Sequence, residues 1–167
     1  MTYAITLDSP IGPLLIETND KALTHISLPQ NGRQPSEAPS IGELRKEEGA
    51  PEILEEVVRQ LTEYFAGERT EFDLPIELDG TEFQRDVWTS LAEIPYGKTV
   101  SYADLATMVG RPSAFRAVGQ ANGANPIPIV LPCHRVIASG GGIGGYGGGL
   151  PMKRQLLGLE GRDGFQV

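Results

Sequence analysis

The chain has 167 residues, enough for one domain or for two small ones with a hydrophobic core. It carries 14 Lys and Arg against 22 Asp and Glu, and this net charge of −8 argues, on its face, against nucleic-acid binding. No apolar run is long enough to span a membrane, and the N-terminus lacks the basic and apolar regions of a signal peptide, so we expect a cytoplasmic protein with no membrane partner. The single cysteine, Cys133, excludes an internal disulfide and a multi-cysteine zinc site, and we expect no bound metal.

The negative charge is concentrated in the first half of the chain. Residues 1–80 hold 6 Lys and Arg against 16 Asp and Glu, a net charge of −10, whereas residues 81–167 hold 8 against 6, a net charge of +2. The glutamates between Glu43 and Glu56 are typical of a solvated helix face. Because the second half is close to neutral, it can still present a local basic surface. The whole-chain charge therefore does not decide whether the protein binds nucleic acid.

The first half predicts a small sheet followed by a helix. Three β-prone segments separated by turn-forming residues indicate an antiparallel meander: Tyr3–Leu7, Leu14–Glu17 and Leu23–Leu28. Residues 29–42 are rich in Pro, Ser and Gly and predict a surface loop. Apolar residues from Ile53 to Phe65 have helical spacing, and Gly67 ends that helix. Residues 71–76 are compatible with a further strand or with an extended linker.

The second half predicts mostly helices. An apolar helical stripe runs from Phe83 to Ile94, and Ser101 with Asp104 resembles a capping box that begins a helix over Tyr102–Val109. We expect Pro112 to begin the next helix, which runs to about Gly123 after a turn of about three residues. This spacing matches a helix-turn-helix, although many such helix pairs bind no DNA. A final helix is predicted over Leu150–Leu159.

The sole cysteine is followed directly by a histidine. A lone cysteine is most often a buried, inert apolar residue, but an adjacent imidazole can accept the thiol proton and activate it. Neighbouring residues in an extended chain point to opposite faces, so a water or a bend after Pro132 is needed to connect Cys133 with His134. The other histidine, His25, lies in the predicted meander and is interpreted as structural.

Residues 140–149 contain eight glycines and include a G-x-G-x-x-G pattern. A dinucleotide site is rejected because the remaining chain has room for only one helix. Two interpretations of this segment remain open: a pocket wall that a planar ligand can approach closely, and a flexible loop. On the second helix of the predicted pair, small residues surround Arg116, and they allow close approach either to the protein core or to a nucleic-acid groove: Ala114, Ala117 and Gly119.

The segment Leu131-Pro-Cys-His-Arg-Val136 resembles the active-site signature of the O6-alkylguanine-DNA alkyltransferases, also called methylated-DNA–protein-cysteine methyltransferases. Further segments match that family in order and approximate spacing: Phe83-Gln-x-x-Val-Trp88, Ile94-Pro-Tyr-Gly97, Ser101-Tyr102, Arg116-Ala-Val-Gly119, Asn125-Pro126, Tyr146-x-Gly-Gly148 and Leu156-Leu-x-x-Glu-Gly161. The resemblance is strong over residues 81–161 and general over residues 1–80. So many motifs in order around one cysteine are highly specific.

The resemblance implies an α/β (α+β) protein. A small N-terminal domain of sheet and helix, residues 1–78, would precede a mostly helical C-terminal domain, residues 79–167, with a helix-turn-helix and the active site. The implied activity is DNA repair, in which the alkyl group of O6-alkylguanine, and of O4-alkylthymine, moves irreversibly to Cys133 in a single turnover. The implied partner is double-stranded DNA, bound through its minor groove by a monomer, and no cofactor is implied.

The resemblance also implies roles for individual residues. His134 would draw off the thiol proton through a water, and Glu160 would orient the imidazole. Tyr102 would support the phosphate of the flipped nucleotide or assist protonation of the leaving base, and Arg116 would fill the gap in the base stack. Asn125 would stabilise the turn that leads to Cys133. The remaining implied positions are a DNA-binding set, Ser101, Ala114, Ala117 and Gly119, and a guanine-pocket set, Tyr146, Gly147, Gly148 and the main chain of Cys133 and Val136.

This sequence departs from versions of the family pattern at two places. Gly147 stands where some members have serine, so a side-chain hydroxyl contact to O6 is replaced, at most, by a backbone amide. The N-terminal half has no cysteine, whereas members with structural zinc use cysteines there. Two other functions stay open at this point: a Cys–His hydrolase acting on acyl substrates, and a helix-turn-helix DNA binder or lesion sensor in which Cys133 is inert.

Overall fold

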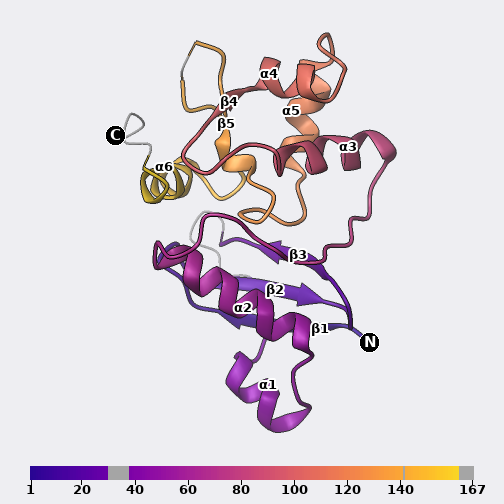
Figure 1. Cartoon of the computed structure of the whole chain (residues 1–167), viewed down its shortest axis with the longest axis vertical. Helices are drawn as coiled ribbons and strands as arrows, with labels where there is room; N and C mark the ends of the chain where they lie inside the picture. The colour runs from indigo at the N-terminus through magenta and orange to yellow at the C-terminus, as the bar shows by residue number, and fades with distance from the viewer. Residues whose placement is uncertain (30–37, 141, 162–167) are drawn as a thin grey trace. The chain divides into compact units, whose positions relative to one another are not determined.

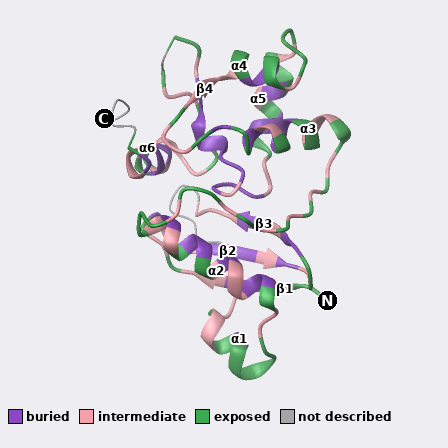
Figure 2. Ribbon diagram, in the orientation of Figure 1, coloured by how far each residue is buried: buried purple, intermediate pink, exposed green. Residues whose placement is uncertain are grey.

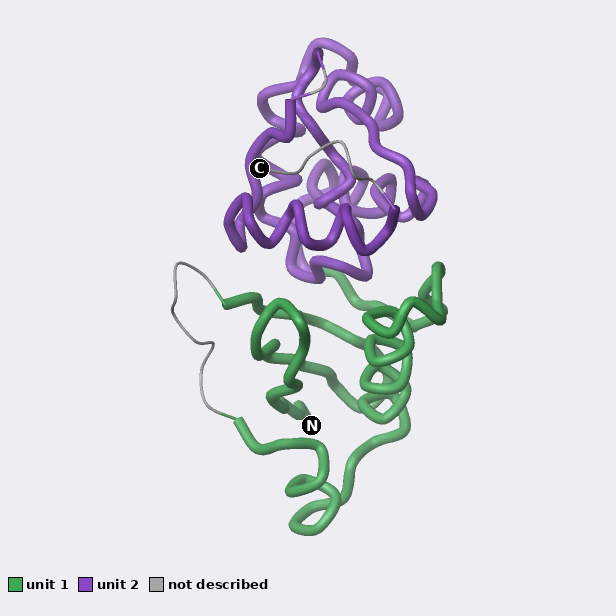
Figure 3. The backbone as a smooth tube through the Cα atoms, turned by 90° about the vertical axis from the view of Figure 1, so that its left-hand side faces the viewer, with its two compact units in different colours: residues 1–78 green, residues 79–167 purple. Residues whose placement is uncertain are grey.

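The computed structural model describes residues 1–29, 38–140 and 142–161, so most of the loop predicted over residues 29–42 lies outside the described residues. The chain divides into two compact units, Met1–Leu78 and Asp79–Val167 (Figure 3). The architecture is mixed, with a three-stranded sheet in the first unit and mostly helices in the second (Figure 1). This confirms the predicted α/β fold class.

The first unit is built on an antiparallel meander, as predicted. Strands β1 (Tyr3–Leu7), β2 (Leu14–Thr18) and β3 (Leu23–Ser27) follow one another in the sheet. Ile5 pairs with Ile16, and Ile16 pairs with Ile26, so three buried isoleucines lie side by side on one face. The predicted helix is α2 (Glu52–Phe65), which buries one side and exposes the other (Figure 2).

A short helix precedes α2, and it begins before the end of the predicted loop, so the predicted loop end was wrong. Helix α1 (Ile41–Glu47) begins within residues 29–42, because the Ser40 hydroxyl accepts a hydrogen bond from the Glu43 amide and the Glu43 carboxylate accepts one from the Ser40 amide. This is a capping box, which stabilises a helix start that composition alone had assigned to a loop. The Ser-x-x-Glu spacing was the signal that could have predicted it.

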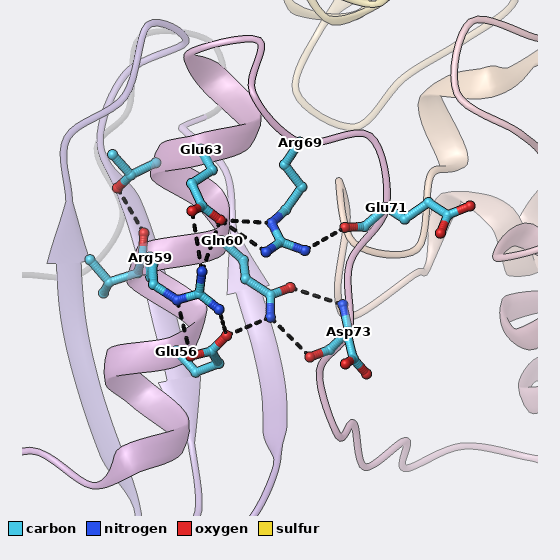
Figure 4. A network of polar contacts seen from close by, with 9 residues as sticks. Glu56, Arg59, Gln60, Glu63, Arg69, Glu71 and Asp73 are labelled. Carbon is cyan, nitrogen blue, oxygen red and sulfur yellow. Dashed lines mark hydrogen bonds and ion pairs between the residues drawn. The ribbon is translucent and has the colours of Figure 1, made fainter.

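The segment after α2 is extended and is held to that helix by a buried glutamine. Gln60 is only 2% exposed, and its side-chain amide donates to the Asp73 carbonyl at 2.9 Å and accepts from the Asp73 amide at 2.9 Å (Figure 4). Arg69 bonds Glu63 and the carbonyl of Glu71 in the same network. Beyond it, Ile76 forms an isolated bridge with Leu23, so residues 71–76 are an extended linker with one β-bridge.

The second unit places its helices around a short parallel pair of strands. Helices α3 (Glu82–Leu91), α4 (Tyr102–Met108) and α5 (Phe115–Gly123) pack together, and α6 (Leu150–Leu159) ends the described chain. Strand β4 (Val100–Ser101) pairs with β5 (Val136–Ile137). The one tryptophan of the chain, Trp88, is 3% exposed and donates from Nε1 to the Ala121 carbonyl of α5 at 2.7 Å.

The helix pair is present, but the turn between its helices is longer than predicted. The capping box of Ser101 with Asp104 begins α4, as expected. Pro112, however, does not begin α5, because the Ala114 amide donates to the Arg111 carbonyl at 2.9 Å and places Pro112 inside a β-turn. Proline suits the second position of such a turn as well as it suits the first turn of a helix. Helix α5 therefore begins at Phe115, and the turn spans Val109–Ala114.

Candidate active site

The cysteine lies directly after a sharp bend at Pro132. The Cys133 amide donates to the Leu131 carbonyl at 2.8 Å, and Pro132 has φ −80° and ψ 68°, the geometry of an inverse γ-turn. Cys133, His134 and Arg135 then form a single turn of 3-10 helix, η1 (Cys133–Arg135). The bend that the sequence required after an extended segment is therefore present.

The parallel pairing of β4 with β5 joins the cysteine turn to the segment that carries α4. Val100 pairs with Val136 and Ser101 with Ile137, so the cysteine turn enters the strand pair at one end, and Tyr102 and Ala138 leave it together at the other. Asn125 holds the segment before the turn, because its Nδ2 donates to the Leu131 carbonyl at 2.7 Å and its Oδ1 accepts from the Ile127 amide at 3.0 Å. This geometry is consistent with the hinge position expected for Asn125.

The Cys133 side chain is buried, with only 7% of the residue exposed. Burial raises the pKa of the thiol to about 11, and the Asn125 side chain and the positive charge of Lys153 offset only part of that rise. At neutral pH the resting group is therefore the thiol, which is a poor nucleophile. Chemistry at Cys133 requires a base that accepts its proton.

His134 and Glu160 form a buried pair. The Nε2 atom of His134 lies 2.7 Å from Oε2 of Glu160, and neither side chain is exposed. Burial raises the pKa of Glu160, but hydrogen bonds from His134 and Arg135 outweigh it and bring that pKa to about 2. Burial also lowers the pKa of His134. At neutral pH the carboxylate is therefore ionised and the imidazole is neutral.

These charge states determine which imidazole nitrogen carries the proton. An ionised carboxylate only accepts hydrogen bonds, so Nε2 of His134 must be the N–H and Nδ1 must carry the lone pair. Nδ1 is buried and has no hydrogen-bond partner among the described residues. The result is a neutral base with a free acceptor atom in the same turn as the thiol.

Two further buried cations were not identified as site residues from the sequence. Arg135 donates to both oxygens of Glu160, and Lys153 donates from Nζ to the Val136 carbonyl at 2.6 Å and the Gly145 carbonyl at 2.9 Å. Burial lowers the pKa of Lys153 to about 8. Lys153 lies in helical spacing with the buried Leu156 and Leu157, and a lysine within an apolar stripe was the signal available.

The glycine-rich segment lies against Tyr102. Gly144 has φ +75°, and a Cβ built on it would lie 3.1 Å from the Tyr102 hydroxyl and 3.2 Å from the Ala138 amide nitrogen. A side chain at Gly144 would thus both strain the backbone and displace Tyr102. In the same segment, Tyr146 has a buried hydroxyl with no partner among the described residues, whereas Gly147 is exposed and Gly148 half-buried.

The expected DNA-binding residues lie on α4, α5 and their flanks. Arg116 and Ala117 are exposed and Ala114 is half-buried, and no hydrogen bond or ion pair engages the Arg116 side chain within the described residues. A Cβ on Gly119 would lie 3.7 Å from the Tyr102 ring, an ordinary van der Waals contact, so the fold has room for a methyl group there. Ser101 uses its hydroxyl to cap α4.

Ranges 1–29, 38–140 and 142–161 contain no cluster of His, Cys, Asp and Glu side chains that could hold a metal ion. Over the same part of the chain, no helix is long and apolar enough to cross a membrane.

The comparisons with known proteins agree with one another. The 6-O-methylguanine DNA methyltransferase ribonuclease-like domain matches residues 2–78, and the DNA binding domain of the same proteins matches residues 82–162. A methylated-DNA–protein-cysteine methyltransferase of Mycolicibacterium paratuberculosis is 50% identical, over 94% of this chain and 91% of the relative. One from Methanosarcina barkeri is 44% identical, over 95% and 96%.

A solved structure covers nearly the same span. The crystal structure of Mycobacterium tuberculosis OGT in complex with DNA is 46% identical, with a TM-score of 0.81 over 95% of this chain and 92% of that one. The two family models together span both units, and the relatives are matched over nearly their whole length. The chain therefore belongs to the 6-O-methylguanine DNA methyltransferase family.

Proposed function

We propose that this protein repairs DNA by moving the alkyl group of O6-alkylguanine, and of O4-alkylthymine, to Sγ of its own Cys133. The observation that carries the proposal is the buried His134–Glu160 pair. It leaves a neutral imidazole with an unprotonated Nδ1 in the same turn as the sole cysteine. Family membership supports it, because the relatives are named protein-cysteine methyltransferases. The DNA complex of the Mycobacterium tuberculosis relative supports DNA as the partner.

In the proposed reaction, Nδ1 of His134 takes the Cys133 proton through a bridging water. The thiolate then attacks the sp³ carbon of the alkyl group, so that an S–C bond forms as the C–O6 bond breaks and its electron pair stays with guanine. Tyr102 assists protonation of the departing base or supports the phosphate of the flipped nucleotide. The product thioether has no carbonyl that water could attack, unlike an acyl-enzyme, so each molecule reacts once.

The base enters a pocket formed by the glycine-rich segment and the cysteine turn. Tyr146, Gly147 and Gly148 line it, and the main chain of Cys133 and Val136 contacts the base edge. Since Gly147 has no hydroxyl, only backbone groups at that position contact O6. Lys153 supports this arrangement, because its Nζ joins the Val136 carbonyl to the Gly145 carbonyl of the glycine-rich segment.

DNA binds the helix pair through the minor groove, and the damaged base leaves the stack to reach Cys133. Extrusion of a base costs on the order of a few kcal/mol, and Arg116 offsets part of that cost by filling the gap. The small residues around it allow close contact with the groove: Ser101, Ala114, Ala117 and Gly119. The protein acts as a cytoplasmic monomer without a cofactor.

Intact-protein mass spectrometry tests the proposal. After incubation with a duplex that contains O6-methylguanine, we expect a stoichiometric gain of one methyl group, abolished in Cys133→Ser. An unchanged mass despite DNA binding would refute the transfer and favour a lesion sensor. Repeated turnover of an acyl substrate without a lasting mass change would favour a hydrolase instead.

A further inference from the structure

Arg135 donates hydrogen bonds to both oxygens of the Glu160 carboxylate, which also bonds His134. Its Nε donates to Oε1 of Glu160 at 2.8 Å, and its Nη2 donates to Oε2 at 3.0 Å, the same oxygen that accepts from His134. Its remaining Nη1 donates to the Ile94 carbonyl at 2.7 Å, and its guanidinium lies 5.7 Å from the centre of the Tyr96 ring. Arg135 is 6% exposed, so the whole arrangement is buried.

This arrangement differs from a buried carboxylate whose only partner is a histidine. A buried carboxylate with no other positively charged partner favours a protonated imidazole beside it, because an opposite charge nearby stabilises the charged form of both groups. Here the guanidinium already compensates Glu160 through two hydrogen bonds. The positive charge of Arg135 also disfavours a second positive charge on the neighbouring ring.

We propose that Arg135 is a positioning residue that keeps His134 neutral, with its proton on Nε2, so that Nδ1 is free to accept a proton. Without Arg135, Glu160 would favour an imidazolium against the opposing effect of burial, and the Nδ1 of an imidazolium already carries a proton and cannot accept another. The contacts of Arg135 with Glu160, and of Glu160 with His134, support this role whether or not the protein repairs DNA. The consequence for repair rests on the function proposed above.

The other ionisable groups around His134 do not supply the same compensation. Lys153 on α6 acts in the same direction as Arg135, but its Nζ donates to carbonyl groups and makes no bond with Glu160. The remaining groups are neutral in the resting state: the thiol of Cys133, whose pKa burial raises, and the phenols of Tyr96 and Tyr146, whose pKa values burial also raises. Among the described residues, Arg135 is the permanent cation whose hydrogen bonds to the carboxylate are established.

Two matched substitutions separate charge from hydrogen bonding. Arg135→Gln can still donate hydrogen bonds toward Glu160 or Ile94 but has no charge. Arg135→Lys keeps the charge but loses the two guanidinium donors that bond both oxygens of Glu160. The double variant Arg135→Gln/Glu160→Gln removes both charges. In the full chain, we expect His134 to become protonated at neutral pH in Arg135→Gln alone and to remain neutral in Arg135→Lys and in the double variant.

The readout is the ¹⁵N chemical shift of the imidazole nitrogens followed by NMR as a function of pH. The chain has only two histidines, and His25 is exposed on β3 in the first unit, so its signals serve as an internal control for effects that are not local to Arg135. We expect the His134 titration to move upward by at least about one pH unit in Arg135→Gln, with His25 unchanged. An unchanged His134 titration in folded Arg135→Gln would overturn the proposal. If that variant does not fold, protonation of His134 at neutral pH in folded Arg135→Lys would overturn it equally.

A second readout follows the rate at which iodoacetamide, a small alkylating probe, modifies Cys133. We expect Arg135→Gln to react at least about tenfold more slowly at neutral pH and to recover as the pH rises through the raised pKa of His134, because the imidazole is then neutral again. A pH-independent loss of reactivity would contradict the proposal. A shifted His134 titration in a protein that takes no methyl group from DNA would refute the proposed function and leave the role of Arg135 intact.

Discussion

The side chains of the site differ in how firmly the fold holds them. Cys133, His134 and Glu160 are buried, and His134 and Glu160 are joined by a 2.7 Å contact. Arg116, by contrast, is exposed, with no hydrogen bond or ion pair to any described residue. The buried groups are therefore held in place by the fold, whereas no hydrogen bond or ion pair to a described residue fixes the Arg116 side chain. Such a division suits a side chain that acts on DNA rather than on the reacting atoms.

For this reason, Arg116→Ala should separate base extrusion from alkyl transfer. We expect repair of O6-methylguanine in duplex DNA to slow by about tenfold or more, since loss of about 1.4 kcal/mol from a base-flipping step has that effect. Transfer from a free O6-alkylguanine base should change little. Single-turnover mass spectrometry on both substrates gives the two rates. Lys98→Ala, which removes another exposed cation, is the charge control, and equal losses on both substrates would rule out this role for Arg116.

At the scale of elements, three helices of the described chain begin with capping boxes, and one of these caps lies within the expected DNA-binding set. The boxes are Ser40 with Glu43, Thr81 with Gln84, and Ser101 with Asp104. In each, the serine or threonine hydroxyl accepts from a backbone amide that has no partner within its helix. For Ser101 the cap alone gives the hydroxyl a structural purpose, independent of DNA.

Ser101→Ala should therefore lower the free energy of unfolding by about 1 kcal/mol, the usual cost of losing an N-cap. Urea denaturation followed by circular dichroism measures it. Ser113→Ala is the matched control, because Ser113 is exposed in the turn and makes no side-chain hydrogen bond within the described chain. A destabilised Ser101→Ala that binds DNA as tightly as the unmodified protein would show that Ser101 is a cap and not a DNA contact.

The elements could be predicted where the information is local. β-Prone segments between turn-forming residues predicted the meander, and helical apolar spacing predicted α2 and α3. The capping spacing predicted the start of α4, and a helix was expected at the residues that form α6. Pro112 misled the prediction because a helix start and a β-turn both accept proline, and only the Arg111–Ala114 hydrogen bond distinguishes them. The start of α1 was missed for the opposite reason, since a true capping signal lay within loop-like composition.

The contacts within the site could not be predicted from local sequence patterns. Arg135 stands in the recognised motif, but its contacts are with Glu160, 25 residues away, and with Ile94, 41 residues away. Lys153 likewise contacts Val136 across the fold. Such contacts are set by tertiary packing, so resemblance to a family could name Cys133, His134 and Glu160 but not the cation that compensates the carboxylate.

On the scale of the whole molecule, the charge of −8 combines a unit rich in acid with one that is nearly neutral. In the second unit, the exposed cations among the described residues are Arg85, Lys98, Arg111 and Arg116. The cations Arg135 and Lys153 are buried and bond protein groups. Arg154 is half-buried, so few cations in the described part of this unit are fully exposed for phosphate contacts.

We therefore expect a shallow dependence of DNA affinity on salt. Each phosphate contact contributes a slope of about −0.9 to the logarithm of the association constant against the logarithm of salt concentration, so four cations allow a slope no steeper than about −4. Fluorescence anisotropy of a labelled duplex over a range of KCl concentrations measures this slope. A slope clearly steeper than about −4 would show that cations outside this group of four contact DNA.

Trp88 has a practical consequence at the same scale. It is the one tryptophan of the chain, and its indole bonds the backbone of α5 in the second unit. Tryptophan emission therefore reports on that unit alone, whereas far-ultraviolet circular dichroism reports on both. Comparing the two signals during denaturation shows whether the acidic unit and the unit with the helix pair unfold together, without any added label.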